Sequence, residues 1–89
     1  MEIGLRIVQR VFDDVLAGRI SREQADRWAY TVVQHNEAHT LQYSSSEDRE
    51  RVWAAVMYLY GVDITTAPGK YLHADDDIRN EMYERFGHK

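Results

Sequence analysis

The stretch that decides the fold is G-R-I-S-R-E-Q-A, residues 18–25, which separates two segments of helical periodicity. Gly18 suits the left-handed residue that commonly ends a helix. Ser21, with Gln24 three residues later, has the spacing of a reciprocal capping box at the start of the next helix. So short a connection predicts that the two helices pack against each other as an antiparallel hairpin.

On either side of this turn, apolar residues recur at the spacing of an amphipathic helix. The first helix is predicted to run from about Glu2 to Ala17, and the second carries an inward stripe from Ala25 to Val32. The apolar positions of the first are Ile3, Ile7, Val8, Val11, Phe12, Val15 and Leu16. We expect both helices to bury these stripes in a common core.

Two further helices are predicted in the second half of the chain. The third begins at an N-cap formed by Ser44 or Ser45 and ends at Gly61. A loop over residues 62–72 follows, in which P-G at 68–69 fits a type II turn and Tyr71-Leu72 allows a short extended piece. The fourth helix runs from about Asp75 to Phe86. The fold class is therefore all-α: one domain, 1–89, forming a small four-helix, mainly antiparallel bundle.

Composition and charge narrow the classes of function. The 89 residues include 44% apolar and 29% charged residues, no cysteine, and fifteen acids against eleven bases. The net charge of −4 argues against a nucleic-acid ligand and is compatible with a basic protein partner. Arg6 and Asp13 interrupt the N-terminal apolar run, and no segment approaches the ~20 apolar residues of a membrane span, so we expect a cytoplasmic protein without membrane contact.

The motif H-N-E-A-H, from His35 to His39, resembles a zinc-binding histidine pair. In a helix, however, Glu37 lies about 160° from either histidine and cannot act as base for a shared metal. We favour imidazoles at a helix C-terminus, where the helix dipole stabilises positive charge. A small metal-binding protein that uses His35 and His39 remains an alternative, while the favoured interpretation includes neither a metal nor a cofactor.

The run of three aspartates from Asp75 to Asp77 has two interpretations. Consecutive helical residues fan out by about 100°, so these carboxylates do not converge on one ion. Negative charge in a first helical turn is stabilised by the helix dipole, and the same carboxylates can also meet a partner's lysines or arginines. Because the sequence holds neither a nucleophile elbow nor a glycine-rich phosphate loop, we expect a protein that is not an enzyme.

Six tyrosines provide the second candidate feature. Tyrosines near acids are typical of protein-binding surfaces, although half-burial beneath loops with the hydroxyls in water explains them equally well. Recognition residues concentrate in loops and at helix starts. We therefore predict a partner-binding surface composed of two groups: Tyr71 with Asp75, Asp76 and Asp77, and Tyr43 with Glu47 and Asp48.

Three stretches together resemble small bacterial helical proteins and, more loosely, the immunity proteins that neutralise toxins of bacterial competition: L-A-G-R-I-S-R-E-Q-A-D-R-W-A (16–29), V-W-A-A-V-M-Y-L-Y-G-V-D (52–63) and Y-L-H-A-D-D-D-I (71–78). This resemblance implies an immunity or antitoxin-like protein that occludes a basic toxin domain. In that family's pattern a serine usually caps the last helix where Ala74 stands, so Asp75 or the His73 side of the turn is expected to cap it instead. The alternative is a homo-oligomeric structural or regulatory protein, a homodimer that covers its tyrosines.

Overall fold

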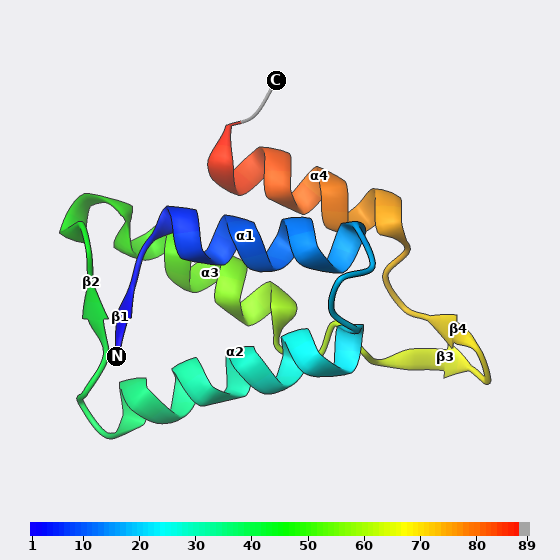
Figure 1. The fold of residues 1–89 in the computed structure, drawn as a ribbon, viewed down its shortest axis with the longest axis horizontal. Coiled ribbons are helices and arrows are strands. Elements are labelled where there is room, and N and C mark those ends of the chain that lie inside the picture. Colours follow the sequence, from blue (N-terminus) through cyan, green and yellow to red (C-terminus); the bar gives the residue numbers. More distant parts are fainter. Residues whose placement is uncertain (88–89) are drawn as a thin grey trace.

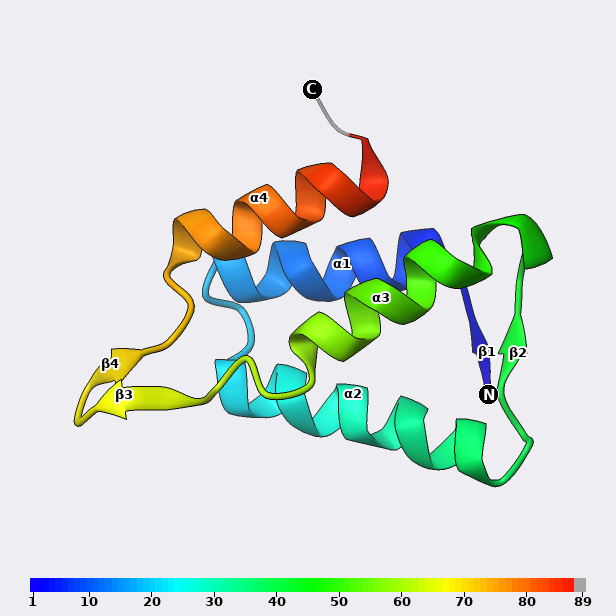
Figure 2. The ribbon, with the colours of Figure 1, turned by 180° about the vertical axis from the view of Figure 1, so that it is seen from behind.

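The computed structural model describes residues 1–87, and most of these residues are helical. The four α-helices are α1 (Leu5–Leu16), α2 (Arg22–Glu37), α3 (Arg49–Leu59) and α4 (Asp75–Phe86), and a short 3₁₀ turn, η1 (Ser46–Asp48), leads into α3. In Figures 1 and 2, α1 and α3 lie between α4 on one side and α2 on the other. The prediction of a mostly helical, four-helix chain is confirmed, whereas the mainly antiparallel order of the bundle stays a prediction.

The turn between α1 and α2 has the predicted chemistry. Gly18 adopts a left-handed conformation with φ of 76°. The Ser21 hydroxyl accepts a hydrogen bond from the Gln24 backbone N–H at 3.0 Å, and the Gln24 side chain accepts one from the Ser21 N–H at 2.8 Å. Both halves of the capping box are therefore present, and they fix the start of α2.

The first residues form a strand, which corrects the prediction that the first helix starts at Glu2. Strand β1 (Glu2–Ile3) pairs in parallel with β2 (Gln42–Tyr43), and the Ser44 N–H donates to the Ile3 carbonyl at 2.8 Å. Ile3 is fully buried. The apolar pattern was misleading because the Ile3 side chain can reach the core from a strand as well as from a helix. The strand that pairs with residues 2–3 lies about forty residues further along the chain.

A second small sheet lies at the opposite end of the molecule (Figure 1). Strands β3 (Thr65–Ala67) and β4 (Lys70–Tyr71) form an antiparallel hairpin inside the predicted loop. Its turn contains Pro68 and Gly69, and Gly69 has φ of 77°, the left-handed conformation that a type II turn requires at its third residue. The predicted extended piece near residue 71 is thus one strand of a hairpin.

The starts of α3 and α4 are built differently from the predictions. Neither Ser44 nor Ser45 caps α3 through its side chain; η1 precedes the helix, and the Asp48 N–H donates to the Ser45 carbonyl at 3.2 Å. Ala74 occupies the N-cap of α4, and the Asp77 carboxylate accepts a hydrogen bond from its backbone N–H at 3.0 Å. Asp77, rather than Asp75 or His73, therefore completes the cap, whereas the bounds of α4 match the prediction.

The core gathers apolar side chains from β1 and all four helices. Phe12 of α1 is at its centre, with ring centroids 6.2 Å from Tyr58 of α3 and 5.7 Å from Phe86 of α4. The fully buried side chains of largest volume are Phe12, Ile3, Leu59, Ile78, Val8, Val32, Val52, Val56 and Val62. Within residues 1–87, no helix is both long enough and apolar enough to cross a lipid bilayer.

Candidate functional site

The three aspartates of α4 all have intramolecular partners. The Asp75 carboxylate accepts a hydrogen bond from Arg22 at 2.7 Å, and Asp76 accepts one from Arg79 at 2.9 Å. Asp77 caps its own helix. Asp75 and Asp76 nevertheless remain largely exposed, at 63% and 88% of their side-chain area. The Arg79–Asp76 pair, in which both side chains are exposed, contributes little to stability. Contact of the Asp75 and Asp76 carboxylates with a partner stays a prediction.

Tyr71 lies on the hairpin against the start of α2. The Arg22 guanidinium is 4.5 Å from the centroid of the Tyr71 ring, and the Tyr71 hydroxyl donates to the Glu23 carboxylate at 3.0 Å. This hydrogen bond to a carboxylate raises the pKa of Tyr71 above its ordinary value. Tyr71 therefore joins the hairpin to α2, and its contact with a partner stays a prediction.

The second predicted group, Tyr43 with Glu47 and Asp48, is divided by the structure. Glu47 is exposed on η1, and Asp48 forms an ion pair with Arg51. The ring of Tyr43, on β2, instead faces the guanidinium of Arg49 at 5.9 Å. Tyr43 thus has a cation as its neighbour, where the sequence suggested carboxylates.

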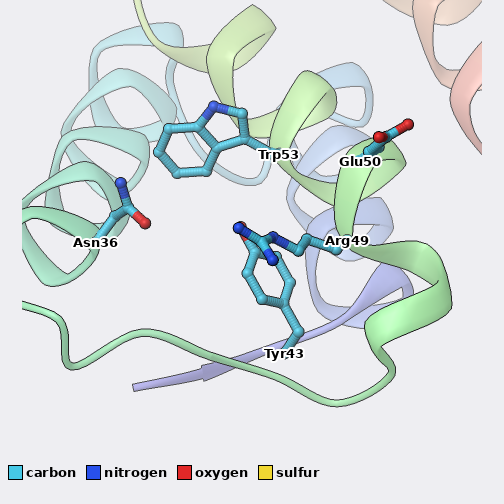
Figure 3. A pocket seen from close by; sticks show the side chains of 5 residues that line it. All are labelled: Asn36, Tyr43, Arg49, Glu50 and Trp53. Atoms are coloured by element: carbon cyan, nitrogen blue, oxygen red, sulfur yellow. The ribbon is translucent and has the colours of Figure 1, made fainter.

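Tyr43 lines a pocket of about 230 Å³, which we call the Tyr43–Trp53 pocket; its walls are Asn36, Tyr43, Arg49, Glu50 and Trp53. Figure 3 shows the Tyr43 ring and the Trp53 indole on neighbouring walls, with the Arg49 guanidinium over the tyrosine. The Asn36 amide points into the pocket from α2, while the Glu50 carboxylate lies at the outer side. Aromatic faces, an amide and a guanidinium therefore surround one small volume.

Three separate pieces of local structure assemble this pocket. The β1–β2 pairing fixes the backbone at Tyr43, and η1 places Arg49 at the first residue of α3. Trp53 follows Arg49 by four residues, so the two side chains lie on the same side of the helix. Asn36 comes from the last turn of α2. The sequence signal was the R-x-x-x-W spacing shortly after a tyrosine, and it was missed because nothing local ties it to Asn36.

The guanidinium of Arg49 favours an anionic ligand, and the aromatic walls of the pocket favour a planar one. Among residues 1–87, Arg49 has no carboxylate within ion-pair distance, in contrast to Arg19, Arg22, Arg51, Arg79 and Arg85. Burial raises the pKa of Tyr43, and the positive charge of Arg49 acts in the opposite direction. Tyr43 is therefore a neutral, partly desolvated ring at ordinary pH, suited to stacking.

The histidine pair does not have the geometry that its spacing suggested. Helix α2 ends at Glu37, and His39 lies beyond it with φ of 59°. The His35 Nδ1 atom is 2.7 Å from the Thr40 hydroxyl. The two imidazoles thus do not share a helical face, and in residues 1–87 no group of three or more histidine or acidic side chains is placed to hold a metal ion.

Comparison with known proteins identifies a family. The family model described as "YxzC DNA-binding protein" matches residues 3–85. A Bacillus subtilis (strain 168) protein described as "Uncharacterized protein YxzC" is 33% identical over 66 residues, which are 74% of this chain and 48% of that relative. The chain therefore spans about half the length of this curated relative. No solved structure matches the chain.

The family match overturns the resemblance to immunity proteins and, with it, the expected basic toxin partner and the exclusion of nucleic acid. The homodimer and the metal-binding protein gain no support from it. A G-R-I-S turn and an acidic first turn suit any bundle with a tight hairpin, so they indicate a fold and not a ligand. Net charge is a weak ground for excluding a nucleic-acid ligand, because it averages over the whole surface. Since the match covers nearly the whole chain, this protein belongs to the family described as YxzC DNA-binding protein.

Proposed function

We propose that this protein binds DNA and that the Tyr43–Trp53 pocket is the point of contact. The observation that carries the proposal is the match of residues 3–85 to a family described as DNA-binding. The pocket supports it because guanidinium, amide and aromatic groups are those that contact phosphates and bases. The protein would act by binding, without catalysis, and a cytoplasmic location suits that role in a bacterium.

Arg49 is the residue proposed to meet the DNA backbone. It is exposed at the first residue of α3, and no carboxylate of residues 1–87 lies within ion-pair distance of its guanidinium. Its guanidinium presents several N–H donors in a planar fork that matches a phosphate. Contact with the Tyr43 ring limits the orientations of this side chain, so less conformational entropy is lost when the phosphate binds.

The overall negative charge limits the affinity without excluding the ligand. Of the lysines and arginines in residues 1–87, those with no carboxylate within ion-pair distance are Arg6, Arg10, Arg27, Arg49 and Lys70. Phosphate contacts dominate DNA affinity and weaken as salt rises. We therefore expect binding that is measurable at low ionic strength and modest near physiological salt.

Fluorescence anisotropy of end-labelled DNA, at about 50 mM salt where counterion release favours binding, tests the proposal. Arg49→Gln should weaken binding by about tenfold, the effect of ~1.4 kcal/mol. Arg27→Gln is the matched control, since Arg27 is an exposed arginine of α2 outside the pocket and its loss changes the net charge equally. Absence of binding to any form of DNA under these conditions would refute the proposed function. Equal weakening by Arg49→Gln and Arg27→Gln would show that the Tyr43–Trp53 pocket is not the point of contact.

A further inference from the structure

We infer that the Tyr43–Trp53 pocket holds one unpaired nucleobase, so that the protein recognises single-stranded DNA in preference to duplex. This inference rests on the proposed function and specifies the form of DNA that the site accepts. It is carried by the size of the pocket, the chemistry of its walls, and the distribution of cations over the described surface.

The volume of the pocket fits a single planar ring system. At about 230 Å³ it is smaller than the ~300–1,000 Å³ of sites for drug-sized ligands. A paired base is enclosed by its partner and its stacked neighbours, and only its groove edges are accessible. A base that is free of its partner presents its whole face to the Tyr43 ring and the Trp53 indole.

The two aromatic walls supply the main attraction. Stacking on an aromatic side chain tolerates any base, because every base has a π-face. Tyr43 and Trp53 come from different elements, β2 and α3, which orients them as neighbouring walls (Figure 3). A ring inserted between α2 and β2 therefore contacts aromatic surface that duplex DNA cannot reach without losing a base pair.

Polar groups at the rim match the rest of a nucleotide. The Asn36 amide has both a donor and an acceptor, as do the hydrogen-bonding edges that an unpaired base exposes. The Glu50 carboxylate points away from the two rings, so it is assigned no contact with the base. Arg49, held over Tyr43, is close enough to the stacking surface to meet the phosphate of the same nucleotide.

The remaining cations are dispersed, which disfavours a duplex. A duplex-binding surface commonly neutralises about 6–10 phosphates. In residues 1–87 the cations free of carboxylate partners are distributed over α1, α2, α3 and the β3–β4 hairpin, as Arg6, Arg10, Arg27, Arg49 and Lys70. The exposed carboxylates at the start of α4 also repel the phosphates of a duplex, which cannot bend away from them easily. Stacking must then supply much of the affinity.

The test compares one labelled oligonucleotide as a single strand and as its duplex, with Trp28→Phe protein so that Trp53 is the sole indole. We expect single-strand affinity at least tenfold above duplex affinity and quenching of Trp53 fluorescence by the single strand. Tyr43→Leu should lower single-strand affinity by about tenfold, the loss of ~1.4 kcal/mol of stacking. Tyr30→Leu is the control, since Tyr30 is 46% exposed on α2 outside the pocket.

The outcomes separate this inference from the proposed function. Duplex affinity equal to or above that of the single strand, without Trp53 quenching, overturns the inference and leaves DNA binding intact. Binding of neither form refutes both. Asn36→Ala, at an exposed position on α2, provides a second variant if Tyr43→Leu disturbs the β1–β2 pairing; unchanged single-strand affinity in that variant excludes the amide from the site.

Discussion

The Arg22 guanidinium lies 4.5 Å from the centroid of the Tyr71 ring, which places the first residue of α2 against the second strand of the hairpin. The same group donates to the His73 carbonyl at 2.6 Å and to the Asp75 carboxylate at 2.7 Å. Only 12% of the Arg22 side chain is exposed. One arginine thus joins α2, the hairpin and the start of α4.

Replacement of Arg22 should therefore destabilise the protein measurably. We expect Arg22→Met to lower the free energy of unfolding by ~1.5–3 kcal/mol, the range for charge-assisted hydrogen bonds of a shielded group. Arg19→Met is the control, because the Arg19 side chain of the Arg19–Asp14 pair is 63% exposed and exposed pairs contribute at most about 1 kcal/mol. Urea unfolding measures both, and equal losses would contradict the connecting role of Arg22.

Asp26 connects α2 to the end of α3. Its carboxylate accepts a hydrogen bond at 2.7 Å from the backbone N–H of Gly61, where the chain has φ of 97° after the helix. Asp26→Ala leaves this partly buried N–H without its partner, so we expect a loss of ~1–3 kcal/mol in unfolding free energy. Asp13→Ala, at an exposed position on α1, should change stability by less than about 0.5 kcal/mol. Urea unfolding of the two variants tests this, and a smaller loss for Asp26→Ala than for Asp13→Ala would show that the bond is unimportant.

The features that sequence predicted correctly are those encoded by neighbouring residues. The hairpin between α1 and α2 follows from Gly18, Ser21 and Gln24, and α4 is bounded by an acidic first turn and a glycine. Strand β1 was missed because its pairing partner is about forty residues distant. The stacking of Tyr58 on Phe12 was not predicted either, because helix periodicity does not tell how many neighbours surround α3.

The residues of the candidate site were harder to predict than the fold. Of the pocket's five residues, only Tyr43 was among the predicted partner-binding residues. The other four come from the end of α2 and the start of α3, and only tertiary structure brings these segments together. Three of the acidic residues predicted to bind a partner form ion pairs with arginines of the same chain: Asp75, Asp76 and Asp48.

Tyr58 predicts a pH dependence of stability. Its hydroxyl is buried without a hydrogen-bond partner in the described residues, and burial, followed by the charges of Asp77 and Glu81, raises its pKa to about 12. A tyrosine in the unfolded chain has a pKa of about 10. The folded state thus binds the Tyr58 proton more tightly than the unfolded state does. This difference contributes to the free energy of unfolding in full below pH ~10, and the contribution is lost as pH rises towards ~12. Tyr58→Phe should flatten the decline of unfolding free energy over this window.

At neutral pH the same substitution should be neutral or stabilising by up to about 1 kcal/mol, since it removes an unpaired buried polar group. Tyr83→Phe, which removes an exposed phenol hydroxyl of α4, is the matched control. Chemical denaturation at a series of alkaline pH values measures both effects. If Tyr58→Phe and Tyr83→Phe flatten the alkaline decline of unfolding free energy equally, burial of the Tyr58 hydroxyl is not the cause of that decline.

The dependence of DNA affinity on salt should reveal how few phosphates are contacted. Each phosphate neutralised on a single strand contributes about −0.7 to the slope of log K against log salt concentration. With Arg49 as the cation at the pocket, we expect a slope between about −1 and −2, and a reduction by ~0.7 in Arg49→Gln. Anisotropy titrations at several salt concentrations measure it. A slope steeper than about −5 would indicate an extended basic surface and contradict a binding mode based on stacking.

Gly4 links the fold to the pocket through the close approach of β1 and β2. A Cβ atom at Gly4 would lie 2.9 Å from the Ser44 hydroxyl oxygen and 3.1 Å from the Ser44 Cβ. Because Ser44 directly follows Tyr43, Gly4→Ala should displace Tyr43 from the pocket, lowering DNA affinity and reducing unfolding free energy by ~1–3 kcal/mol through overpacking. Adding Ser44→Gly removes both contacting atoms, so the double variant should recover most of the affinity.

Gly18→Ala separates displacement of Tyr43 from loss of stability in general. Its added Cβ meets no atom within 4 Å, but φ of 76° strains any side chain there. Such strain costs ~1–3 kcal/mol without moving β2. We therefore expect Gly18→Ala to unfold at lower urea concentration yet bind DNA like the parent protein at temperatures where it is folded. Parallel urea and anisotropy titrations decide the matter: if Gly4→Ala also retains full affinity, the β1–β2 contact does not position the Tyr43 ring for DNA.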